Sequence, residues 1–331
     1  MKYNSILNLI ETEVAIKFVK DTFEKELARA LNLTRVSAPL FVDPETGLND
    51  NLNGYERAVS FDVKALGENS KVEIVQSLAK WKRMALAKYG FKTGTGLYTD
   101  MNAIRRDEDL DEVHSVYVDQ WDWEKIITRE DRRLPYLKNT VKSIYKVFLK
   151  TLRAVGKKYP ELTDDYLPDK ITFISTEELE KNYPNKTRKD REKAICKECG
   201  AVFVYRIGWD LSDGMPHDGR AADYDDWKLN GDIILWNPVL NNAFEISSMG
   251  IRVDEKSLVR QLNKRRESWK LGNPYCEGVL HNELPLTIGG GIGQSRLCMY
   301  LLKKAHIGEV QASVWPQKII KENEEKGIFL L

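Results

Sequence analysis

The spacing of the expected strands sets narrow limits on the fold. Strand-like segments at 97–106 and 114–126, and again at 201–208, 232–236 and 243–253, follow one another with few helical crossovers between them. Parallel neighbours need a long connection, usually a helix, whereas antiparallel neighbours can be joined by a short turn. The sequence therefore predicts an α+β fold, with an antiparallel β-sheet flanked by helices.

The other segments supply helices and outer strands. A strand is expected at 35–42, where Pro39 suits a sheet edge or an interface, and a half-buried strand is expected at 58–66. The chain should change from strand to helix near Ser77. Helices are expected at about 5–31, 132–157, 176–182, 187–199 and 254–270. No repeat or low-complexity linker interrupts residues 1–331, so we expect a single domain.

Charge and hydropathy exclude some classes of partner. With 51 Lys and Arg against 50 Asp and Glu, the formal net charge is +1, so no overall field attracts nucleic acid or an anionic membrane. The first residues lack the apolar block of a secretory signal, and no apolar run reaches membrane-spanning length. We expect a cytoplasmic protein without a membrane partner.

Cysteine usage gives little support for a metal site. Cys196 and Cys199 form one C-x-x-C, but Cys276 and Cys298 do not form the second close pair that a zinc site would need. We expect Cys196 and Cys199 to lie on the last helical turn before Gly200, with a packing role.

The segment GGGIGQSRL places a glycine cluster immediately before an expected helix, an arrangement typical of nucleotide sites. The dinucleotide fingerprint fails, because its third glycine position holds Gln294 or Arg296, and no lysine follows as a phosphate loop requires. The remaining pattern is G-x-G-x-G-x-x-R, formed by Gly289, Gly291, Gly293 and Arg296.

The expected strand SVYVDQWDWEK has a polar face. Alternate side chains of a strand point the same way, and one set comprises Val118, Gln120, Asp122 and Glu124. Three polar residues in four suit the floor of a polar pocket, although a solvent-facing strip would give the same pattern. Trp121 and Trp123 point to the opposite face and are expected to fill the core.

Three motifs, in order along the chain, resemble those of class II aminoacyl-tRNA synthetases. TRVSAPL, around Pro39, resembles the dimer-forming motif 1; Arg105-Arg106-Asp107 resembles motif 2, R-x-[ED]; and the glycine–arginine pattern resembles motif 3. QWDWE and FEISSMGIR, which holds Glu245 and Arg252, are similar to the aspartyl and asparaginyl members.

A narrower resemblance covers nearly the whole chain. VQSLAKWKR, GLYTDMNAIRRDED, LNGDIILWNPV and GGGIGQSRL are similar to the ammonia-dependent asparagine synthetases, also called aspartate–ammonia ligases. This family resemblance implies a class II synthetase-like catalytic core and a homodimer. It also implies a reaction of L-aspartate, ATP and ammonia through a β-aspartyl-adenylate to L-asparagine, AMP and pyrophosphate.

Two other readings stay open. One is an aspartyl- or asparaginyl-tRNA synthetase paralogue without its anticodon-binding barrel; the other is an inert paralogue that senses a nucleotide or amino acid. Too few residues precede Pro39 for a barrel, and no Lys/Arg cluster suggests another tRNA surface, so we expect no anticodon-binding domain and no tRNA partner. Residue 2 is Lys rather than a cysteine nucleophile, which favours free ammonia over glutamine.

The resemblance implies roles around the nucleotide. Arg105, with Arg106 as its competitor, would bridge the α-phosphate and the reacting carboxylate. Arg296 would lie over adenine, and Val118 takes the place of the phenylalanine that the class usually has beneath it. His114 would approach the terminal phosphates, unless it is only a loop residue. Gly291 and Gly293 would let the backbone approach the nucleotide closely, and Ser248 could add a hydroxyl contact to the nucleotide or substrate.

The Mg²⁺ that accompanies ATP would be held mainly by phosphate oxygens and one or two carboxylates. Glu245 is the first candidate. Asp232 is the second, although its expected position at a strand start would also suit a turn cap.

For aspartate, the family resemblance points to Ser77, Lys82, Arg105, Gln120 and Asp122. Three of the four cations on the Lys82 helix should form its solvated face, and Ser77 could instead cap that helix. Asp50, in a loop that looks mobile, could hold the substrate's ammonium group or accept a proton from incoming ammonium. The sequence leaves both roles open.

Overall fold

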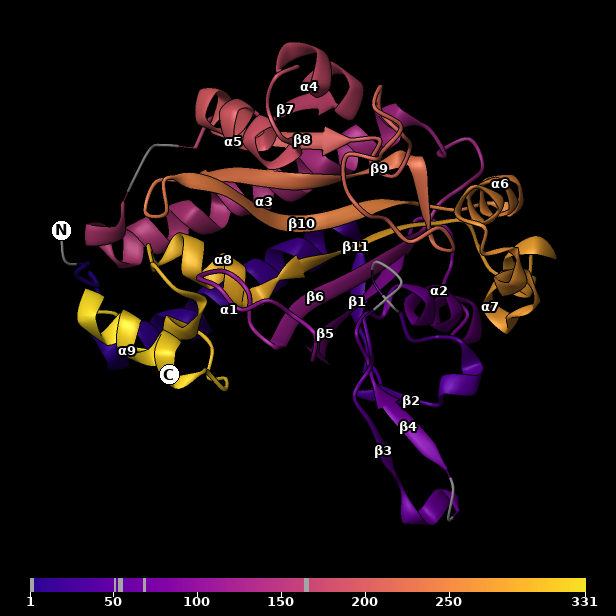
Figure 1. Ribbon diagram of the computed structural model, residues 1–331, viewed down its shortest axis with the longest axis horizontal. Coiled ribbons are helices and arrows are strands. Elements are labelled where there is room, and N and C mark those ends of the chain that lie inside the picture. The colour runs from indigo at the N-terminus through magenta and orange to yellow at the C-terminus, as the bar shows by residue number, and fades with distance from the viewer. Residues whose placement is uncertain (1–2, 51, 53–55, 68–69, 164–166) are drawn as a thin grey trace.

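A mixed eight-stranded sheet forms the centre of the molecule (Figure 1). The computed structural model describes residues 3–50, 52, 56–67, 70–163 and 167–331. In spatial order the strands are β1 (Leu33–Arg35), β5 (Gly96–Ile104), β6 (Tyr117–Ile126), β11 (Thr287–Gly293), β10 (Asn242–Arg252), β9 (Asp225–Asn237), β8 (Ala201–Tyr205) and β7 (Thr172–Ser175).

The prediction of an antiparallel sheet was only partly right. Strands β5, β6, β11, β10, β9 and β8 are antiparallel neighbours, but the outer pairs β1–β5 and β7–β8 are parallel. Helices α4 (Thr176–Asn182) and α5 (Arg188–Cys199) connect β7 to β8, which is the long crossover that a parallel pair needs. Both helices were predicted from the sequence, but β7 was not, and so the crossover was not predicted either.

One face of the sheet is covered by helices α1 (Leu9–Leu31), α3 (Leu134–Lys158) and α8 (Gln294–Leu301). As predicted, Trp121 and Trp123 point into this core and are fully buried. Helix α1 begins later than expected because Asn8 and Glu11 form a capping box. Val19 faces the core, whereas Ile10 is 70% exposed.

The other face is covered mainly towards its two sides. Helix α2 (Ala79–Lys88) packs on β5 and β6, and α5 packs on β9 and β10. Between these helices the middle strands carry polar side chains. Helices α6 (Glu255–Arg265) and α7 (Pro274–Leu280) form a separate small core beyond α2, and α9 (Gln317–Lys326) lies near the C-terminus (Figure 1).

A second, three-stranded sheet projects from the body (Figure 1). It consists of β2 (Phe41–Val42), β4 (Lys71–Ile74) and β3 (Ser60–Asp62). The single strand expected at 35–42 is therefore wrong: the chain leaves the large sheet after Arg35 and enters the small one at Phe41. All three residues of β3 are exposed, and not half-buried as the sequence predicted.

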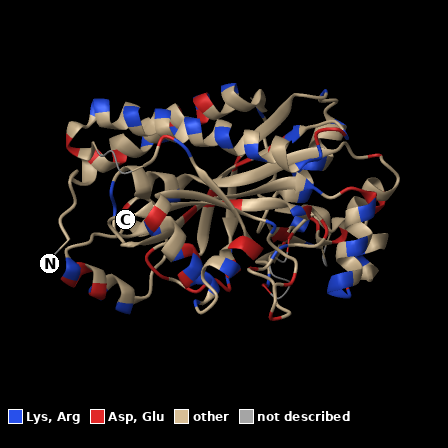
Figure 2. Ribbon diagram, turned by 90° about the horizontal axis from the view of Figure 1, so that it is seen from above, with Lys and Arg blue, Asp and Glu red and all other residues tan. Residues whose placement is uncertain are grey.

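Helix α3 carries a row of cations that the sequence analysis overlooked (Figure 2). Six of its seven basic residues recur three or four positions apart and so share a face; they are Lys138, Lys142, Lys146, Lys150, Arg153 and Lys157. Within α3, all of which the structure describes, no residue is acidic. The expectation that the chain lacks a Lys/Arg cluster is therefore wrong.

The cysteine prediction is confirmed in its geometry. Cys196 and Cys199 lie in the last turn of α5, before Gly200. Cys196 is fully buried against Val202 and Val204, and this burial raises the pKa of its thiol. In the part of the chain that the structure describes, no group of three or more His, Cys, Asp or Glu is arranged to hold a metal ion. None of the described helices is long and apolar enough to cross a membrane.

Candidate active site

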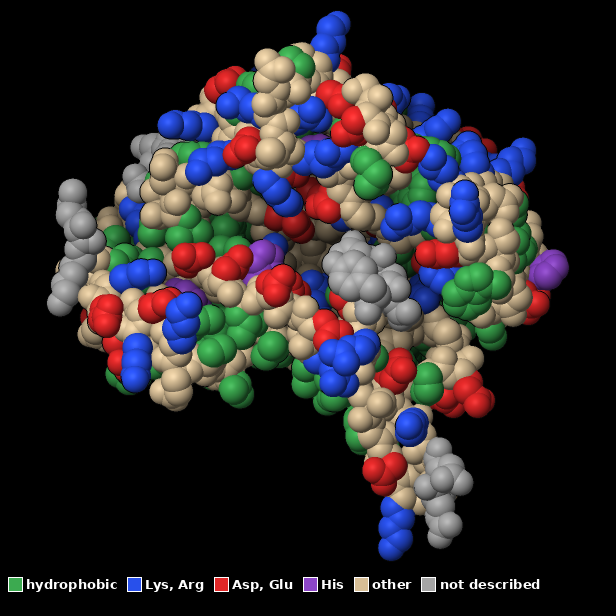
Figure 3. Space-filling model, viewed as in Figure 1, with side chains coloured by type: hydrophobic (Ala, Val, Ile, Leu, Met, Phe, Trp, Pro, Cys, Tyr) green, Lys and Arg blue, Asp and Glu red, His purple; other side chains and the backbone are tan. Residues whose placement is uncertain are grey.

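A pocket of about 400 Å³ opens on the sheet face between α2 and α5. Figure 3 shows a hollow near the middle of this face, with acidic side chains around it. Twelve of the fourteen residues expected from the sequence line this pocket. They are Ser77, Lys82, Arg105, His114, Val118, Gln120, Asp122, Glu245, Ser248, Gly291, Gly293 and Arg296. Asp50 and Asp232 are buried behind its wall instead.

The pocket floor consists of β6 and β11. In their antiparallel register Asp122 lies opposite Gly291, and Glu124 lies opposite Gly289. A Cβ on Gly291 would clash with Gln120 and would lie 2.7 Å from Asp122 Oδ1. The glycines therefore leave the volume that the polar side chains of β6 occupy. They belong to a strand, not to a loop before the helix, and close approach to a nucleotide is only one of their functions.

Lys82 lies under one end of the pocket and is almost completely buried. Its Nζ donates to the carbonyl oxygen of Gly290 at 3.0 Å and lies 3.2 Å from Asp122 Oδ2 and 4.0 Å from Glu124 Oε2. Burial lowers the pKa of Lys82, and the two carboxylates only partly offset that effect.

Three cations of α2 were expected to face solvent, and for two of them this prediction is wrong. Lys80 is buried with its Nζ 3.4 Å from Asp223 Oδ2, and buried Arg83 donates to the carbonyl oxygens of Pro285 and Val253. Only Lys88 is exposed. Helix α2 is wedged between the sheet and the α6–α7 unit, so its cations meet partners on both sides.

Arg252 links the floor to a side wall. Its guanidinium donates to Glu124 Oε1 and Oε2 at 2.8–3.2 Å and also to Asp225 Oδ1. All three side chains are buried. Burial alone would raise the pKa of Glu124, but Arg252 and Lys82 outweigh it and the pKa is lowered. This network of paired charges exists without any ligand.

Of the two competing arginines, Arg105 lines the pocket and Arg106 does not. Arg106 is exposed. The nearest acid to Arg105 is Glu108, whose Oε2 is 3.9 Å from Nη1. The buried Nε of Arg105 has no hydrogen-bond partner among the residues that the structure describes. Asp107, the acidic position of the R-x-[ED] motif, accepts from the backbone N–H of Arg57 at 2.9 Å.

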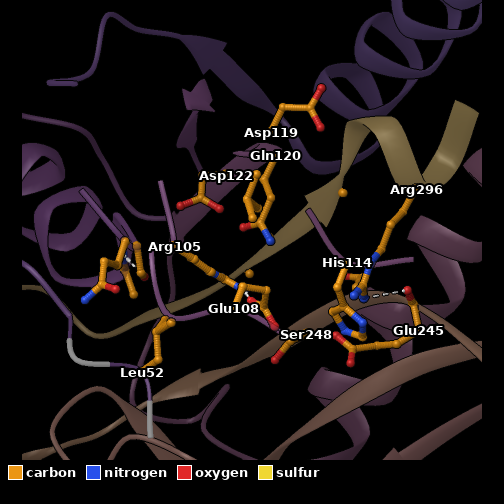
Figure 4. A pocket seen from close by; sticks show the side chains of 18 of the residues that line it. Leu52, Arg105, Glu108, His114, Asp119, Gln120, Asp122, Glu245, Ser248 and Arg296 are labelled. Carbon is orange, nitrogen blue, oxygen red and sulfur yellow. Dashed lines mark hydrogen bonds and ion pairs between the residues drawn. The ribbon is translucent and has the colours of Figure 1, made fainter. Parts of the chain in front are cut away.

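Glu245, Ser248 and Arg296 form the opposite wall (Figure 4). A bulge between Glu245 and Ser247 interrupts the register of β10 with β9, so neighbouring residues of β10 reach the pocket together. Arg296, in the first turn of α8, donates from Nη1 to the carbonyl oxygen of Glu245 at 3.2 Å. His114 lies at the rim, where its Nδ1 is 2.8 Å from Asp111 Oδ1.

Asp119 fixes the start of α8 and so the place of Arg296. Its carboxylate accepts from the backbone N–H and the hydroxyl of Ser295 at 3.0 and 2.8 Å. Lys20, from α1, donates to the same carboxylate at 3.0 Å. Asp119 was not among the site residues expected from the sequence.

The loop that leads into β9 supplies pocket residues that the sequence analysis also missed. They are Asp218, Gly219, Arg220, Ala221 and Tyr224, and Asp225 follows them at the start of β9. The segment HDGRAADYDD offered a signal, because it concentrates charge and a glycine between two predicted strands.

Asp50 and Asp232 are each hydrogen-bonded to a residue of the pocket wall, Asp50 to Tyr224 and Asp232 to Arg220. Tyr224 donates from its hydroxyl to Asp50 Oδ2 at 2.8 Å, so Asp50 contacts the pocket wall from behind. Burial raises the pKa of Asp50, and Lys80 offsets part of that rise. Asp232 lies inside β9 rather than at a strand start, and its Oδ1 accepts a hydrogen bond from Arg220.

Comparisons with known proteins agree on one family. Residues 10–327 match the family model described as aspartate-ammonia ligase. The aspartate–ammonia ligase of Clostridium perfringens strain 13 is 59% identical over 99% of this chain and 97% of its own length. That of Clostridium tetani is 59% identical over 100% and 96%, and that of Bacillus cereus strain B4264 is 58% identical over 99% of each chain.

Solved structures support the fold. Asparaginyl-tRNA synthetase from Pyrococcus horikoshii, complexed with asparaginyl-adenylate, superposes with a TM-score of 0.67 at 16% identity, covering 92% of this chain and 70% of that one. Aspartyl-tRNA synthetase from Entamoeba histolytica gives 0.60 at 13% identity, covering 91% and 58%. The predicted class II synthetase core is therefore confirmed, with a mixed rather than antiparallel sheet.

Proposed function

This chain belongs to the aspartate–ammonia ligase family, and from that premise we propose that its pocket makes asparagine through a β-aspartyl-adenylate. The observation that carries this proposal is the convergence of Lys82, Arg105, Gln120 and Arg296 on one pocket. The chemistry requires such a site. A carboxylate is a poor electrophile, whereas a mixed anhydride with AMP can lose AMP when ammonia attacks.

We propose that Arg105 bridges the β-carboxylate of aspartate and the α-phosphate of ATP. Its unpartnered Nε leaves a donor for an anion, and a planar guanidinium suits both groups. Positioning and charge stabilisation supply most of the catalysis in transfers of this kind. Arg106 has no part in this step, because it does not line the pocket.

The charged network at the floor suits the amino-acid end of aspartate. Lys82 offers a buried cation for the α-carboxylate, while Asp122 offers an anion for the α-ammonium group. Gln120 supplies an amide beside Gly291. Ser77 lines the pocket, but its hydroxyl also accepts from the backbone N–H of Ala79 at 3.2 Å, so it serves the helix start as well.

The nucleotide would lie between β11 and the wall of β10. Arg296 would stack on adenine, Val118 would give that slot an aliphatic side, and His114 would meet the terminal phosphates at the rim; all three residues line the pocket. Gly291 and Gly293 allow close approach, and Ser248 offers a hydroxyl.

A Mg²⁺ ion would accompany ATP and neutralise its phosphates. Glu245 fits as a ligand, because it lines the pocket beside Arg296. Asp232 fits less well, because Arg220 occupies one of its oxygens.

Asp50 is the proposed acceptor of a proton from ammonium, since ammonium must lose a proton before its nitrogen can attack. A carboxylate whose pKa is raised by burial is a better base than an exposed one. Tyr224 connects Asp50 to the pocket wall and would keep its carboxylate in place. Holding the substrate's ammonium group is the alternative role for Asp50.

The test is to incubate the full chain with L-aspartate, MgATP and ammonium. We expect asparagine, AMP and pyrophosphate in equal amounts; formation of ADP would contradict the adenylate intermediate. Replacing ammonium with glutamine should greatly reduce the rate.

The tRNA-synthetase reading is tested by adding tRNA. We propose that the chain acts as one catalytic unit without an anticodon-binding domain and ignores tRNA. Attachment of an amino acid to tRNA would instead favour the tRNA-synthetase reading, and the cationic row on α3 would then be the first surface to examine. We also propose a homodimer, which light scattering during gel filtration would test.

A further inference from the structure

Arg220 is a cation in the pocket wall to which none of the three synthetase motifs assigns a role. It comes from the loop between β8 and β9, lines the pocket, and has a side chain that is only 15% exposed. Nη2 donates to Asp232 Oδ1, and Nη1 donates to the carbonyl oxygen of Gly219 at 3.3 Å. The Nε donor is buried and has no partner among the residues that the structure describes.

Among the described residues, Arg105 also keeps a buried Nε without a hydrogen-bond partner, whereas Arg252 does not. Four arginines line the pocket: Arg105, Arg220, Arg252 and Arg296. Arg252 directs Nε and both terminal nitrogens to carboxylates. Arg105 and Arg220 each retain a buried Nε that has no protein acceptor in the described part of the chain. A buried donor without a partner costs free energy, which an anionic ligand would recover.

The surroundings of Arg220 are strongly acidic. Burial acts to lower its pKa, but Asp232, Asp225, Glu245 and Asp218 outweigh burial and raise it, so the guanidinium stays charged. This wall therefore holds more carboxylates than cations. A triphosphate close to it would be repelled unless Arg220 and a bound Mg²⁺ offset the negative charge.

The position of Arg220 follows from the sheet register. Asp232, which anchors Arg220, lies opposite Ser248, and Ser248 lies opposite Gly291. Arg220 is therefore held over the same strands that carry the proposed nucleotide residues, on the side of Glu245 rather than of Lys82. That is the side where a phosphate chain and its metal ion would lie.

We propose that Arg220 binds the β- and γ-phosphates of ATP and the departing pyrophosphate, and that Asp232 is a positioning residue for Arg220. This inference rests on the proposed adenylate reaction. As pyrophosphate departs, negative charge grows on its oxygens, and a fixed guanidinium stabilises that charge without having to reorganise. Asp232 then acts through Arg220 instead of ligating the metal.

The test compares ligand binding by calorimetry in the full chain. Arg220→Gln should weaken the binding of magnesium pyrophosphate about tenfold or more, because one charge-assisted contact is lost and four carboxylates remain. AMP and aspartate should bind within about twofold of the wild-type affinity. The control is Arg153→Gln on α3, whose side chain is 73% exposed and outside the pocket. Unchanged pyrophosphate binding in a folded Arg220→Gln protein would overturn the proposal.

Asp232→Asn separates positioning from metal ligation. If Asp232 acts through Arg220, the double variant should bind pyrophosphate no more weakly than Arg220→Gln alone. If the two losses add and Asp232→Asn also raises the Mg²⁺ concentration needed for half-saturation, Asp232 is a metal ligand and the positioning role is wrong. These are binding measurements, so they stand apart from the asparagine assay: a wild-type chain that binds pyrophosphate but makes no asparagine would contradict the proposed function alone.

Discussion

The two ends of the pocket differ in how their charges are paired. At the floor, Lys82, Glu124 and Arg252 contact one another or a neighbouring carboxylate directly, and all are buried. At the proposed phosphate end, Arg105 and Arg220 each keep a buried donor without a protein acceptor. The first end is complete before the ligand arrives, whereas the second is completed by the ligand. Stability should therefore depend on the floor and catalysis on the phosphate end.

The largest expected effect is on folding and concerns the floor. Arg252→Met would leave Glu124 and Asp225 buried without their shared cation, at a cost of roughly 3–5 kcal/mol in the free energy of unfolding. Urea denaturation followed by circular dichroism measures this. Adding Glu124→Gln should recover part of the loss, because one of the two uncompensated charges is then removed. A variant as stable as the wild type would show that the floor is not the stabilising network we describe.

The next effect is on catalysis and concerns the open end. Arg105→Ala should lower kcat for AMP formation by about 100- to 1000-fold, the range seen when one donor to a developing negative charge is removed. The same variant should unfold within about 1 kcal/mol of the wild type, because among the described residues the Arg105 side chain has a single ion-pair contact, with Glu108 at 3.9 Å. Arg106→Ala is the matched control, and near-normal turnover in Arg105→Ala would refute its assignment.

A smaller effect is expected from a change at Gly291, in strand β11 of the pocket floor. Gly291→Ala would push a methyl group into Gln120 and Asp122, which costs about 1–3 kcal/mol of strain or displaces both side chains. We expect KM for aspartate to rise more than KM for ATP, because the displaced residues lie on the amino-acid side. Steady-state kinetics with each substrate varied would measure this. An equal rise in both would mean that the clash distorts the whole pocket.

The smallest effect is a pH dependence at Asp50. Burial raises its pKa in the folded protein, so the folded state holds the proton more tightly than the unfolded state does. Stability from this group is thus present at acid pH and lost as pH rises through the raised pKa. Asp50→Asn, which can still accept from Tyr224, should remove that loss. When the free energy of unfolding is measured from pH 4 to pH 8, the variant should become more stable relative to the wild type as the pH rises. A stability difference that does not change with pH would contradict the assignment.

Much of the site followed from local patterns in the sequence. Alternation in β6 predicted that Gln120 and Asp122 share a face, and the resemblance to motifs 2 and 3 pointed to Arg105 and Arg296, which both line the pocket. Arg220 and the burial of Lys80 could not be predicted in this way. They depend on a loop folding back over β9 and on α2 being covered by a distant unit, and neither contact leaves a periodic signal in the chain.

The sheet topology escaped prediction for a related reason. The two parallel pairs are at opposite edges, and each joins strands that are separated by helices or by the small sheet. Propensity located most of the helices between them, but β7 is four residues long and followed at once by α4, so it gave no distinct pattern. The row of cations on α3 could have been predicted, because a helix was expected at 132–157 and its basic residues recur three or four positions apart.

The position of β11 has a consequence for synthesis of the chain. This strand lies between β6 and β10 in the middle of the sheet, although it is the last strand in the sequence. Until it has left the ribosome, β6 and β10 both expose unpaired backbone groups, which are open to pairing with another chain. The pocket floor cannot form before that point, so a nascent chain can bind neither substrate until the strand that completes the floor has been inserted.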